Sequence, residues 1–559
     1  MTMASPGGAW FAATAMAACL TAAPAWGASA QDEAPRSSGT DTTATDAASQ
    51  DKQAGTPKSK DSADQAKDRQ LTIRQYLVKG NTVLDPAVIG NVVQPYMGPN
   101  KHLSDVDKAR KALAEAYQER GFRTVGVTIP RQTASNGIVK LEVVEGKVDV
   151  LTVSNSRYTS LDRIKAEAPS LAEGTVPDFN KVKDDLRSLN RSQNHSVTPK
   201  LTAGNAPGSV DVNLVVDDDF PVSGRAELNN RRSQDTSNLR ALGQISYDNL
   251  WQLGHSATFT YQVAPQNPDD AEVFFGSYLA PVSDHWSVLF NALASDSDVS
   301  TLGGTNVIGR GQVYGLKAIY QLSSSSSSFT SLSASIDYKD YQTNTRFGDN
   351  QFAAPITYVP ISLGLTRTQY GDYYTFGQNA RITFSNLGLG SGADEFDDSR
   401  FNARNQQYYL RGGLSWDQVL PKSFKASFTT NGQITDQPLV TYEQFSAGGM
   451  DSVRGYLEAE QTGDDAIAGT AQFNTPSFDY NNWVNKLTAF AFFDFARLWV
   501  VDALPDQEDR YFLASTGAGL DLSLVSHLNG RVEWAVPLED SFRTEAHDDR
   551  VLFRVWAEF

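Results

Sequence analysis

The sequence predicts two small α+β domains followed by an all-β transmembrane barrel of about 16 antiparallel strands. Three observations lead to this fold class. A strand–helix–helix–strand–strand order over residues 71–147 is followed by a similar order over residues 148–220, which indicates an internal repeat. From residue 221 to residue 559, short alternating segments are separated by polar turns. The chain also ends on a strand with one wholly apolar face.

The composition excludes some classes of function. The 559 residues carry a formal net charge of −17 at pH 7, whereas a nucleic-acid-binding surface is normally basic, so no nucleic-acid partner is expected. No run of about 18 apolar residues follows the N-terminal segment, which argues against a membrane-spanning helix. Barrel strands escape such a search because their lipid-facing and lumen-facing residues alternate.

Residues 1–30 are predicted to be a signal peptide. Ala9–Ala25 is rich in small apolar residues, and Ala28-Ser29-Ala30 fits a small-x-small cleavage site. The alternative is a disordered alanine-rich tail, because no lysine or arginine precedes the apolar region. Cleavage would remove Cys19, the only cysteine, and leave a chain without disulfides that suits the oxidising periplasm. Residues 31–70 are polar and are predicted to be a disordered linker.

The first α+β domain is expected at residues 71–147. Asp85 followed by Pro86 marks a helix start, with aspartate as N-cap and proline in the first turn. A second helix is expected from Ser104, with Asp107 as its capping-box partner. The predicted strands are Leu71–Lys79, Phe122–Ile129 and Ile138–Glu145.

The second α+β domain is expected at residues 148–220. Asp178 is the predicted N-cap of a helix whose apolar residues recur at helical spacing. A turn rich in glycine and proline, Gly204–Gly208, precedes the last strand. The other predicted elements are the strands Val148–Ser154 and Val210–Val216 and a short helix at Ser160–Ala168.

The barrel region, residues 221–559, is expected to hold strands and turns without an amphipathic helix. A run of six serines, Ser323–Ser328, is expected to form a solvated turn. At roughly 10 residues for each strand, the region has room for about 16 strands. Alternating segments are found at His255–Val263, Glu272–Leu279, Ser287–Leu293 and Val313–Leu322.

The last nine residues alternate in polarity. Both charges, Arg554 and Glu558, fall on one face, which fits a strand with lipid on one side and a wet lumen on the other. The alternative is an edge strand of a soluble sheet. Because an open apolar edge favours aggregation, a closed barrel is the better interpretation. The apolar face consists of Val551, Phe553, Val555, Ala557 and Phe559.

A glycine-rich stretch, Gly448–Tyr456, carries one arginine between glycines. Its residues Val453, Arg454, Gly455 and Tyr456 resemble the loop signature of a barrel superfamily that inserts or exports proteins at bacterial outer membranes. The repeated α+β domains resemble the periplasmic POTRA domains of that superfamily. Two such copies with about 16 strands are similar to the two-partner secretion transporters. The matching residues of the first copy are Gly80-Asn81-Thr82, Tyr117, Gly121-Phe122, Pro130, Gln132, Gly137 and Glu145-Gly146.

The resemblance also implies a partner for the arginine. Phe492–Ala496 is similar to a Phe-x-Asp-x-Gly motif of the family's barrel wall, with Ala496 in place of the glycine. The resemblance implies that Arg454, on an inward-folded loop near residues 446–460, pairs with Asp494. Gly448, Gly449 and Gly455 would allow the backbone of that loop to approach the wall closely. The C-terminal strand, with Phe553, Val555 and Phe559, resembles the targeting signal of outer-membrane barrels.

The family resemblance implies an export function. Such a protein secretes a large unfolded exoprotein, which is an adhesin, a haemolysin or a contact-dependent toxin, from the periplasm to the cell surface. Its POTRA-like domains would bind the exoprotein, its barrel would contact outer-membrane lipid, and the barrel-assembly machinery would insert it. Two alternatives remain open, an insertase for other barrels and a passive porin.

No enzymatic activity is expected. The six histidines show no ligand-type pairing, and no nucleophile-elbow motif frames a serine. We therefore predict no catalytic residues, no metal and no cofactor.

Overall fold

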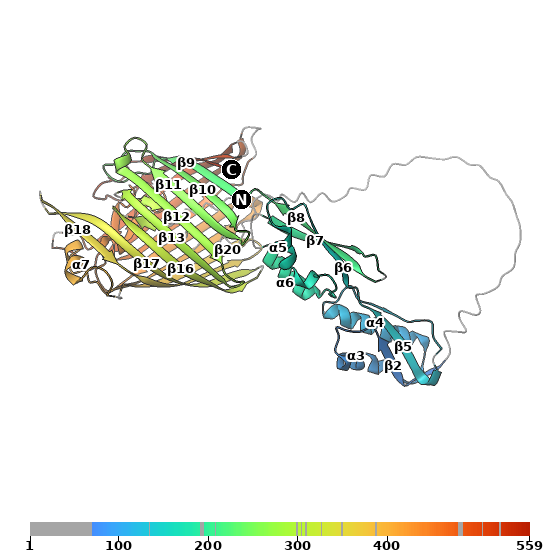
Figure 1. Ribbon diagram of the computed structural model, residues 1–559. Coiled ribbons are helices and arrows are strands. Elements are labelled where there is room, and N and C mark those ends of the chain that lie inside the picture. Colours follow the sequence, from blue (N-terminus) through green and yellow to red (C-terminus); the bar gives the residue numbers. More distant parts are fainter. Residues whose placement is uncertain are drawn as a thin grey trace, which may run out of the picture. The chain divides into compact units, whose positions relative to one another are not determined.

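The computed structural model describes residues 70–559, apart from short gaps at 134, 191–194, 207, 298–299, 303–304, 308–309, 326, 348–349, 386–387, 479–483, 506 and 525–526. The predicted signal peptide and the predicted linker up to residue 69 lie outside the described residues. The described chain divides into two compact units, one that ends at Asp219 and a barrel from Phe220 to Phe559 (Figure 1).

The first α+β domain is a three-stranded sheet packed against two helices. Its central strand is parallel to one neighbour and antiparallel to the other, and its buried residues share one core with the helices. A separate two-stranded sheet joins β1 to β3. The elements are β1 (Leu71–Ile73), β2 (Gln75–Lys79), α3 (Pro86–Val93), β3 (Gly98–Lys101), α4 (Leu103–Glu119), β4 (Gly126–Thr128) and β5 (Ile138–Val144), with sheet order β2-β5-β4.

The start of helix α4 differs from the prediction. Its N-cap is His102, because the carboxylate of Asp105 accepts the backbone N–H of His102 at 2.9 Å and completes the capping box. Asp107, predicted as the capping-box partner, instead pairs with Arg110 at 2.8 Å and Lys111 at 3.2 Å on the helix surface. The predicted N-cap Asp85 is observed, and its carboxylate accepts the N–H of residue 87.

Two predicted strands of this domain are shorter in the structure. The strand predicted at Leu71–Lys79 breaks at Arg74, whose N–H donates to the carbonyl of Gly137 at 2.7 Å. The strand predicted at Phe122–Ile129 is reduced to β4, because the N–H of Phe122 donates at 2.9 Å to the last helical turn.

The motif residues of the first domain hold its turns together. The Glu145 carboxylate accepts the backbone N–H groups of Thr82 at 2.6 Å and Val83 at 3.2 Å. The Tyr117 hydroxyl donates to the Asn81 side chain at 2.6 Å. Burial and the nearby Glu145 carboxylate raise the pKa of Tyr117 to about 12, so its hydroxyl stays a donor at neutral pH.

The second domain repeats this plan. Strand β8 (Val210–Asp218) lies between β6 (Val148–Ser154), which is parallel to it, and β7 (His195–Ala203), which is antiparallel. The helices are α5 (Leu161–Ala166) and α6 (Phe179–Leu189), and the N-cap of α6 is the predicted Asp178. Strand β7 was missing from the prediction, because Pro199 and several polar residues obscure its alternation.

The barrel closes when its last strand pairs with its first. Two strands, β18 and β19, pair with successive stretches of β17 and so occupy one position in the wall, which gives sixteen positions and confirms the predicted fold class. The wall strands are β9 (Val222–Asn229), β10 (Arg240–Leu250), β11 (His255–Val263), β12 (Ala271–Pro281), β13 (Trp286–Ser297), β16 (Arg310–Ser324), β17 (Ser328–Phe347), β18 (Asn350–Tyr358), β19 (Ile361–Tyr370), β20 (Tyr374–Ser385), β21 (Gln407–Val419), β22 (Lys425–Ile434), β25 (Asp465–Asn474), β26 (Val484–Trp499), β27 (Arg510–Leu524), β28 (Leu528–Pro537) and β29 (Arg550–Glu558).

Smaller elements connect the wall strands. Strands β14 and β15 form one hairpin, and β23 and β24 form another. Their bounds are β14 (Ser300–Leu302), β15 (Thr305–Val307), β23 (Phe445–Ala447) and β24 (Gln461–Gly463). Single turns of 3-10 helix across both units are η1 (Gln94–Tyr96), η2 (Ser135–Gly137), η3 (Pro169–Leu171), η4 (Pro268–Asp270), η5 (Pro421–Ser423) and η6 (Thr441–Glu443).

Two expectations for the barrel region were wrong. A short helix, α7 (Ala393–Ser399), lies after β20, where no helix was expected. It buries only Phe396, so it has too few apolar residues to show a helical period in the sequence. The serine run is only partly a turn, because its first two residues belong to β16 and Ser328 begins β17.

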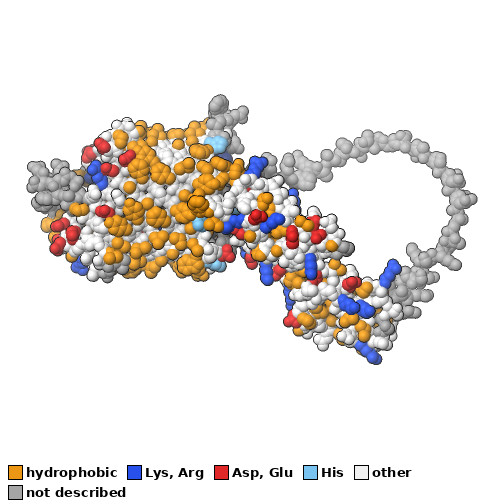
Figure 2. Space-filling view, viewed as in Figure 1, with side chains coloured by type: hydrophobic (Ala, Val, Ile, Leu, Met, Phe, Trp, Pro, Cys, Tyr) orange, Lys and Arg blue, Asp and Glu red, His pale blue; other side chains and the backbone are white. Residues whose placement is uncertain are grey.

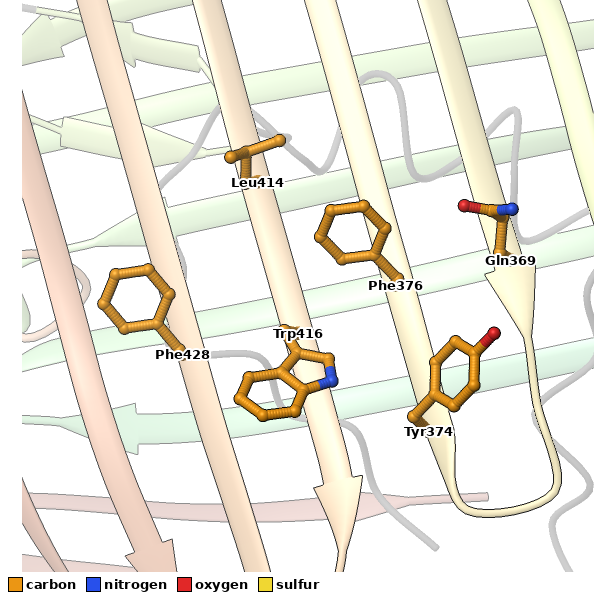
Figure 3. Close-up of a pocket in the computed structure, with 6 residues that line it drawn as sticks. All are labelled: Gln369, Tyr374, Phe376, Leu414, Trp416 and Phe428. Atoms are coloured by element: carbon orange, nitrogen blue, oxygen red, sulfur yellow. The ribbon is translucent and has the colours of Figure 1, made fainter.

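The outer face of the barrel is largely apolar. Figure 2 shows hydrophobic side chains gathered over the wall strands. A shallow hollow of about 400 Å³ lies among outward-facing side chains of β19 to β22 (Figure 3). Its lining residues are Gln369, Tyr374, Phe376, Leu414, Trp416 and Phe428. No helix in the described part of the chain is long and apolar enough to cross a membrane.

The turn after β6 is organised by one carboxylate at the end of the second domain. Asp218 accepts the backbone N–H groups of Arg157 at 2.9 Å, Tyr158 at 2.7 Å and Thr159 at 3.0 Å, and the hydroxyl of Ser156 at 3.2 Å. Burial alone would raise the pKa of Asp218, but these hydrogen bonds to its charged form lower it below its ordinary value.

We expect Asp218→Asn to speed hydrogen exchange of the amides at residues 157–159 by roughly tenfold at neutral pH, because charge-assisted hydrogen bonds are lost. A depressed pKa contributes stability above the ordinary carboxyl pKa and loses it as pH falls through the lowered value. The difference between the variant and the native protein should therefore shrink in acid. Asp219→Asn is the matched control, and equal exchange rates in both variants would contradict the assignment.

Candidate functional site

The segment between β22 and β25, residues 435–464, folds into the barrel. The hairpin of β23 and β24 forms its stem, and the glycine-rich stretch forms its tip. Val453, Arg454 and Tyr456 are fully buried although they lie in a loop. We call residues 445–463 the pore loop.

Glycine is required at defined points of the pore loop. Gly448 and Gly455 have φ angles of +108° and +103°, which other residues rarely adopt. A Cβ atom at Gly448 would lie 2.5 Å from the carbonyl oxygen of Leu457. A Cβ atom at Gly455 would lie 3.1 Å from the backbone nitrogen of Pro537, on the wall. The glycines thus let the loop backbone turn and approach the wall closely.

Arg454 is clamped to the wall by Asp494 of β26. Its Nε donates to Oδ2 of Asp494 at 2.8 Å and its Nη2 donates to Oδ1 at 2.9 Å, a bidentate pair. Its backbone N–H also donates to Oδ2 at 3.1 Å. Both side chains are buried, Arg454 with 1% and Asp494 with 0% of its side chain exposed. The structure therefore brings together the arginine and the carboxylate that were predicted from the sequence.

Three further wall residues contact the guanidinium. Nη1 of Arg454 donates to Oε1 of Glu533 on β28 at 2.8 Å and to Oε1 of Gln472 on β25 at 3.3 Å. The ring of Phe492 on β26 lies beneath it, with 3.4 Å between the arginine Cζ and the ring centroid. One side chain thus joins β25, β26 and β28, and its guanidinium is paired with two carboxylates.

Sequence reasoning missed Glu533 and Gln472. Glu533 alternates with the exposed residues Val532 and Trp534, so its inward position could have been found from the period of two. Its contact with Arg454 could not have been found from the sequence, because several other charged residues also face the lumen. Arg531, two residues away, has its own partner, Asp521, at 2.5 Å.

Apolar packing supports the clamp on its other side. Val453 and Tyr456 belong to a buried cluster with Ala496 and Leu513 of the wall. The Tyr456 hydroxyl donates to the carbonyl of Glu539 at 2.8 Å. Ala496, which departs from the family glycine, is fully buried in this cluster and so supplies a methyl group to the packing.

A second polar cluster fixes the base of the pore loop to another part of the wall. The buried carboxylate of Glu443 accepts the hydroxyls of Tyr358 at 2.7 Å and Tyr409 at 2.5 Å and pairs with Lys339. These partners lie on β18, β21 and β17. In the sixteen-position wall, β17 lies across the barrel from β28, so the segment spans the lumen.

A third cluster lies at the end of the segment. The carboxylate of Asp464 is fully buried. It accepts hydrogen bonds from both terminal nitrogens of the Arg400 guanidinium, at 2.5 and 2.7 Å. Arg400 directly follows α7, which gives that unexpected helix a role in positioning the segment.

The residues of the C-terminal strand lie where the alternation predicts. Val555 and Phe559 face outward and are exposed, and the Phe559 ring lies against Gly224 of β9, where a Cβ atom would collide with it. The N–H of Phe553 donates to the Asn230 side chain at 2.8 Å. Among the described residues, no group of three or more histidine, cysteine or acidic side chains is placed to hold a metal ion.

Comparisons with known proteins agree with this arrangement. A family model described as haemolysin secretion/activation protein ShlB/FhaC/HecB matches residues 208–522, and a model of the ShlB-type POTRA domain matches residues 71–146. The outer membrane transporter CdiB of Dickeya dadantii (strain 3937) is 22% identical over 428 residues, 70% of each chain. The heme/hemopexin transporter protein HuxB of Haemophilus influenzae is 22% identical over 491 residues, 84% of each chain.

Solved structures share the fold. CdiB from Escherichia coli matches with a TM-score of 0.63 at 19% identity, covering 90% of this chain and 93% of that one. BamA from Haemophilus ducreyi lacking POTRA domains 1-3 matches with a TM-score of 0.52 at 13% identity, covering 88% of this chain and 100% of that one.

We expect Arg454→Lys to destabilise the folded barrel by roughly 1–3 kcal/mol, although the charge is kept, because an ammonium cannot make the bidentate pair and reach Glu533 as well. The measurement is the temperature at which the barrel loses its compact electrophoretic mobility. Arg497→Lys, an exposed position on the same strand as Asp494, is the control. An unchanged transition in Arg454→Lys would show that the clamp contributes nothing to stability.

Proposed function

The chain belongs to the haemolysin secretion/activation protein family ShlB/FhaC/HecB, and from this membership we propose that the Arg454 clamp holds a pore loop that must shift when an exoprotein passes. The protein is an outer-membrane transporter of the two-partner secretion type, with its N-terminal POTRA domains in the periplasm. Its family transports proteins and is not a family of enzymes.

The observation that carries the proposal is the burial of Arg454 by four wall residues inside the lumen. A loop that only lined the pore would have no need of a desolvated bidentate ion pair, which costs several kcal/mol in lost hydration for each ion. That cost is offset only by an accurate geometry, so the clamp fixes one position of the loop. A loop fixed across the lumen obstructs the passage of an extended chain.

The exported partner is proposed to be a large unfolded exoprotein of the adhesin, haemolysin or contact-dependent toxin class. Extended segments bind proteins by adding a strand to a free sheet edge. Strand β7 is a poor edge, because the Asn190 side chain bonds both the N–H of Val197, at 2.6 Å, and its carbonyl, at 3.1 Å. Pro199, on the same edge, has no N–H to offer.

Strand β2 of the first POTRA domain is the better candidate for exoprotein capture. Among the described strands it pairs with β5 alone, so its other edge is available. Its Leu77 is exposed beside that edge. We therefore assign the first contact of the exoprotein to Gln75–Lys79.

Two further partners are part of the proposal. The outward aromatic side chains around the hollow of β19 to β22 would contact outer-membrane lipid (Figure 3). The strand that ends in Phe553, Val555 and Phe559 would be recognised by the barrel-assembly machinery during insertion.

A second candidate function is the insertion of other barrels, which rests on the fold shared with BamA. Depletion of the protein separates the two. Loss of one secreted protein supports export, whereas reduced amounts of many outer-membrane barrels would support insertion. A passive porin would change neither, and planar-bilayer recordings would then show a steadily open pore.

We expect Arg454→Ala and Asp494→Ala each to reduce secretion of the exoprotein at least tenfold while the barrel still reaches the outer membrane. The reason is that each substitution leaves a buried charge without its partner, so the loop loses its fixed position. Secreted and outer-membrane amounts are measured by immunoblot, with Arg497→Ala as control. Normal secretion in both variants would remove the proposed role of the clamp.

Capture at β2 is tested by site-specific photo-cross-linking in the full-length transporter. A photoreactive residue in place of Leu77 should cross-link to the exoprotein during secretion. The same residue in place of the exposed Thr198, on β7 beside the blocked edge, should cross-link much less. Equal yields at the two positions would contradict the choice of edge.

A further inference from the structure

The tip of the pore loop makes a second ion-pair contact, which is separate from the Arg454 clamp. Asp451 pairs closely with Arg231 and lies 3.6 Å from Nη2 of Arg554. Arg231 is the second residue after the end of β9, and Arg554 lies in β29. Asp451 therefore contacts the last strand of the barrel and the segment that follows the first strand.

These two strands form the joint of the wall with the shortest ladder. Their ladder runs only from Arg554 opposite Asn229 to Glu558 opposite Arg225, which is shorter than the ladder at any other joint of the barrel. Side chains supplement it, because Asn230 bonds the backbone N–H of residue 553 and the carbonyl of residue 551, each at 2.8 Å. Backbone hydrogen bonds between Gly224 and Phe559, at 3.0 and 3.1 Å, and from Asn230 to the carbonyl of Phe553, at 3.3 Å, also extend the joint, so side chains supply only part of its closure.

The charges at the joint require a carboxylate. Arg231 and Arg554 both contact the carboxylate of Asp451, so these two like charges lie close together. Glu227 of β9 lies 3.0 Å from Nε of Arg554, and Asp451 supplies the second carboxylate between the two cations. Among the described ion pairs, Arg554 would without Asp451 keep Glu227 alone, and Glu227 is already paired with Arg225.

The pore loop holds Asp451 in place from within. The N–H of Glu458 donates to the carbonyl of Arg232 at 3.0 Å, which ties the loop to the segment that follows β9. The Glu458 carboxylate accepts the N–H of Met450 at 2.9 Å. Gly449 packs against that carboxylate, where a side chain would collide with it. Asp451 and Arg454 are three residues apart, so movement of one displaces the other.

We propose that Asp451 is a clasp that joins the pore loop to the β9–β29 joint, so that release of the Arg454 clamp also loosens the closure of the barrel. The inference rests on the proposed function of the pore loop and adds that displacement of the loop loosens the barrel wall at the β9–β29 joint. When the loop leaves its docked position, the joint loses a carboxylate and the wall gains freedom at one defined place. Asp451 is thus a positioning residue, because it acts on the joint through Arg231 and Arg554.

Hydrogen exchange in the full-length protein tests the clasp. Asp451→Asn should speed exchange of the β9 and β29 amides, residues 225–229 and 554–558, by about tenfold. Exchange in β17 and β21, which the base of the loop contacts, should not change. Asp451→Glu, which keeps the charge, should restore most of the protection. Unchanged exchange at β9 and β29 in Asp451→Asn would overturn the proposal.

A matched control separates the clasp from general weakening of ion pairs. Asp509→Asn removes an exposed pair with Arg510 at the start of β27, a strand that pairs with neither β9 nor β29, and should leave the joint unchanged. Should Asp451→Asn fail to form a stable barrel, a disulfide between Leu228→Cys and Val555→Cys, which lie directly opposite in the ladder, should restore it. Failure of that cross-link to restore the barrel would also overturn the clasp.

The failure of the clasp can be distinguished from failure of the proposed function. Arg454→Ala should also raise exchange at the joint, because it frees the loop that carries Asp451. Normal secretion in Arg454→Ala would refute the pore-loop function, whatever the exchange result. Loss of secretion with an unaltered joint would leave that function intact and refute the clasp.

Discussion

The structure depends on one physical constraint, which is that a loop inside a wet lumen cannot be held by hydrophobic burial alone. The pore loop meets a wall whose inward positions are mostly polar, so little apolar area is available to it. Arg454 holds the loop to the wall through ion pairs with Asp494 and Glu533, and the Phe492 ring lies beneath its guanidinium plane. The small apolar cluster around Val453 adds packing where the wall permits it.

The rest of the loop segment follows the same rule. Three further contacts that hold it are built on a buried or partly buried carboxylate, namely Glu443 at the base, Asp464 at the end and Asp451 at the tip. These contacts are distributed around the barrel rather than gathered at one strand. The segment is therefore braced against several parts of the wall at once, and the position of Arg454 is set from both ends of the loop.

The sequence predicted the parts of this arrangement that depend on local patterns. The period of two placed Phe559 and Val555 outward, and helix signals placed Asp85 and Asp178 at N-caps. The capping box of α4 was misplaced because Ser104 with Asp107 fits the sequence pattern, whereas the observed N-cap is His102, a residue type that the pattern does not include. Glu533 and Glu443 could not be assigned, since their partners lie on strands distant in sequence and inward charges are common in a lumen.

Because the pore loop is held to the wall by ion pairs rather than by apolar packing, its release from the wall is less costly. Buried ion pairs contribute little net stability compared with apolar side chains of the same size, because their desolvation offsets their attraction. When the two ions separate in a wet lumen, however, water solvates both of them again. Separating apolar surfaces would instead expose them to water, at a free-energy cost of about 25 cal/mol for each Å². A clamp such as Arg454–Asp494 thus fixes the loop accurately without making its release prohibitively costly. For the proposed function, in which the loop is held in one position and displaced when an extended chain passes, that balance favours an arginine over a larger hydrophobic contact.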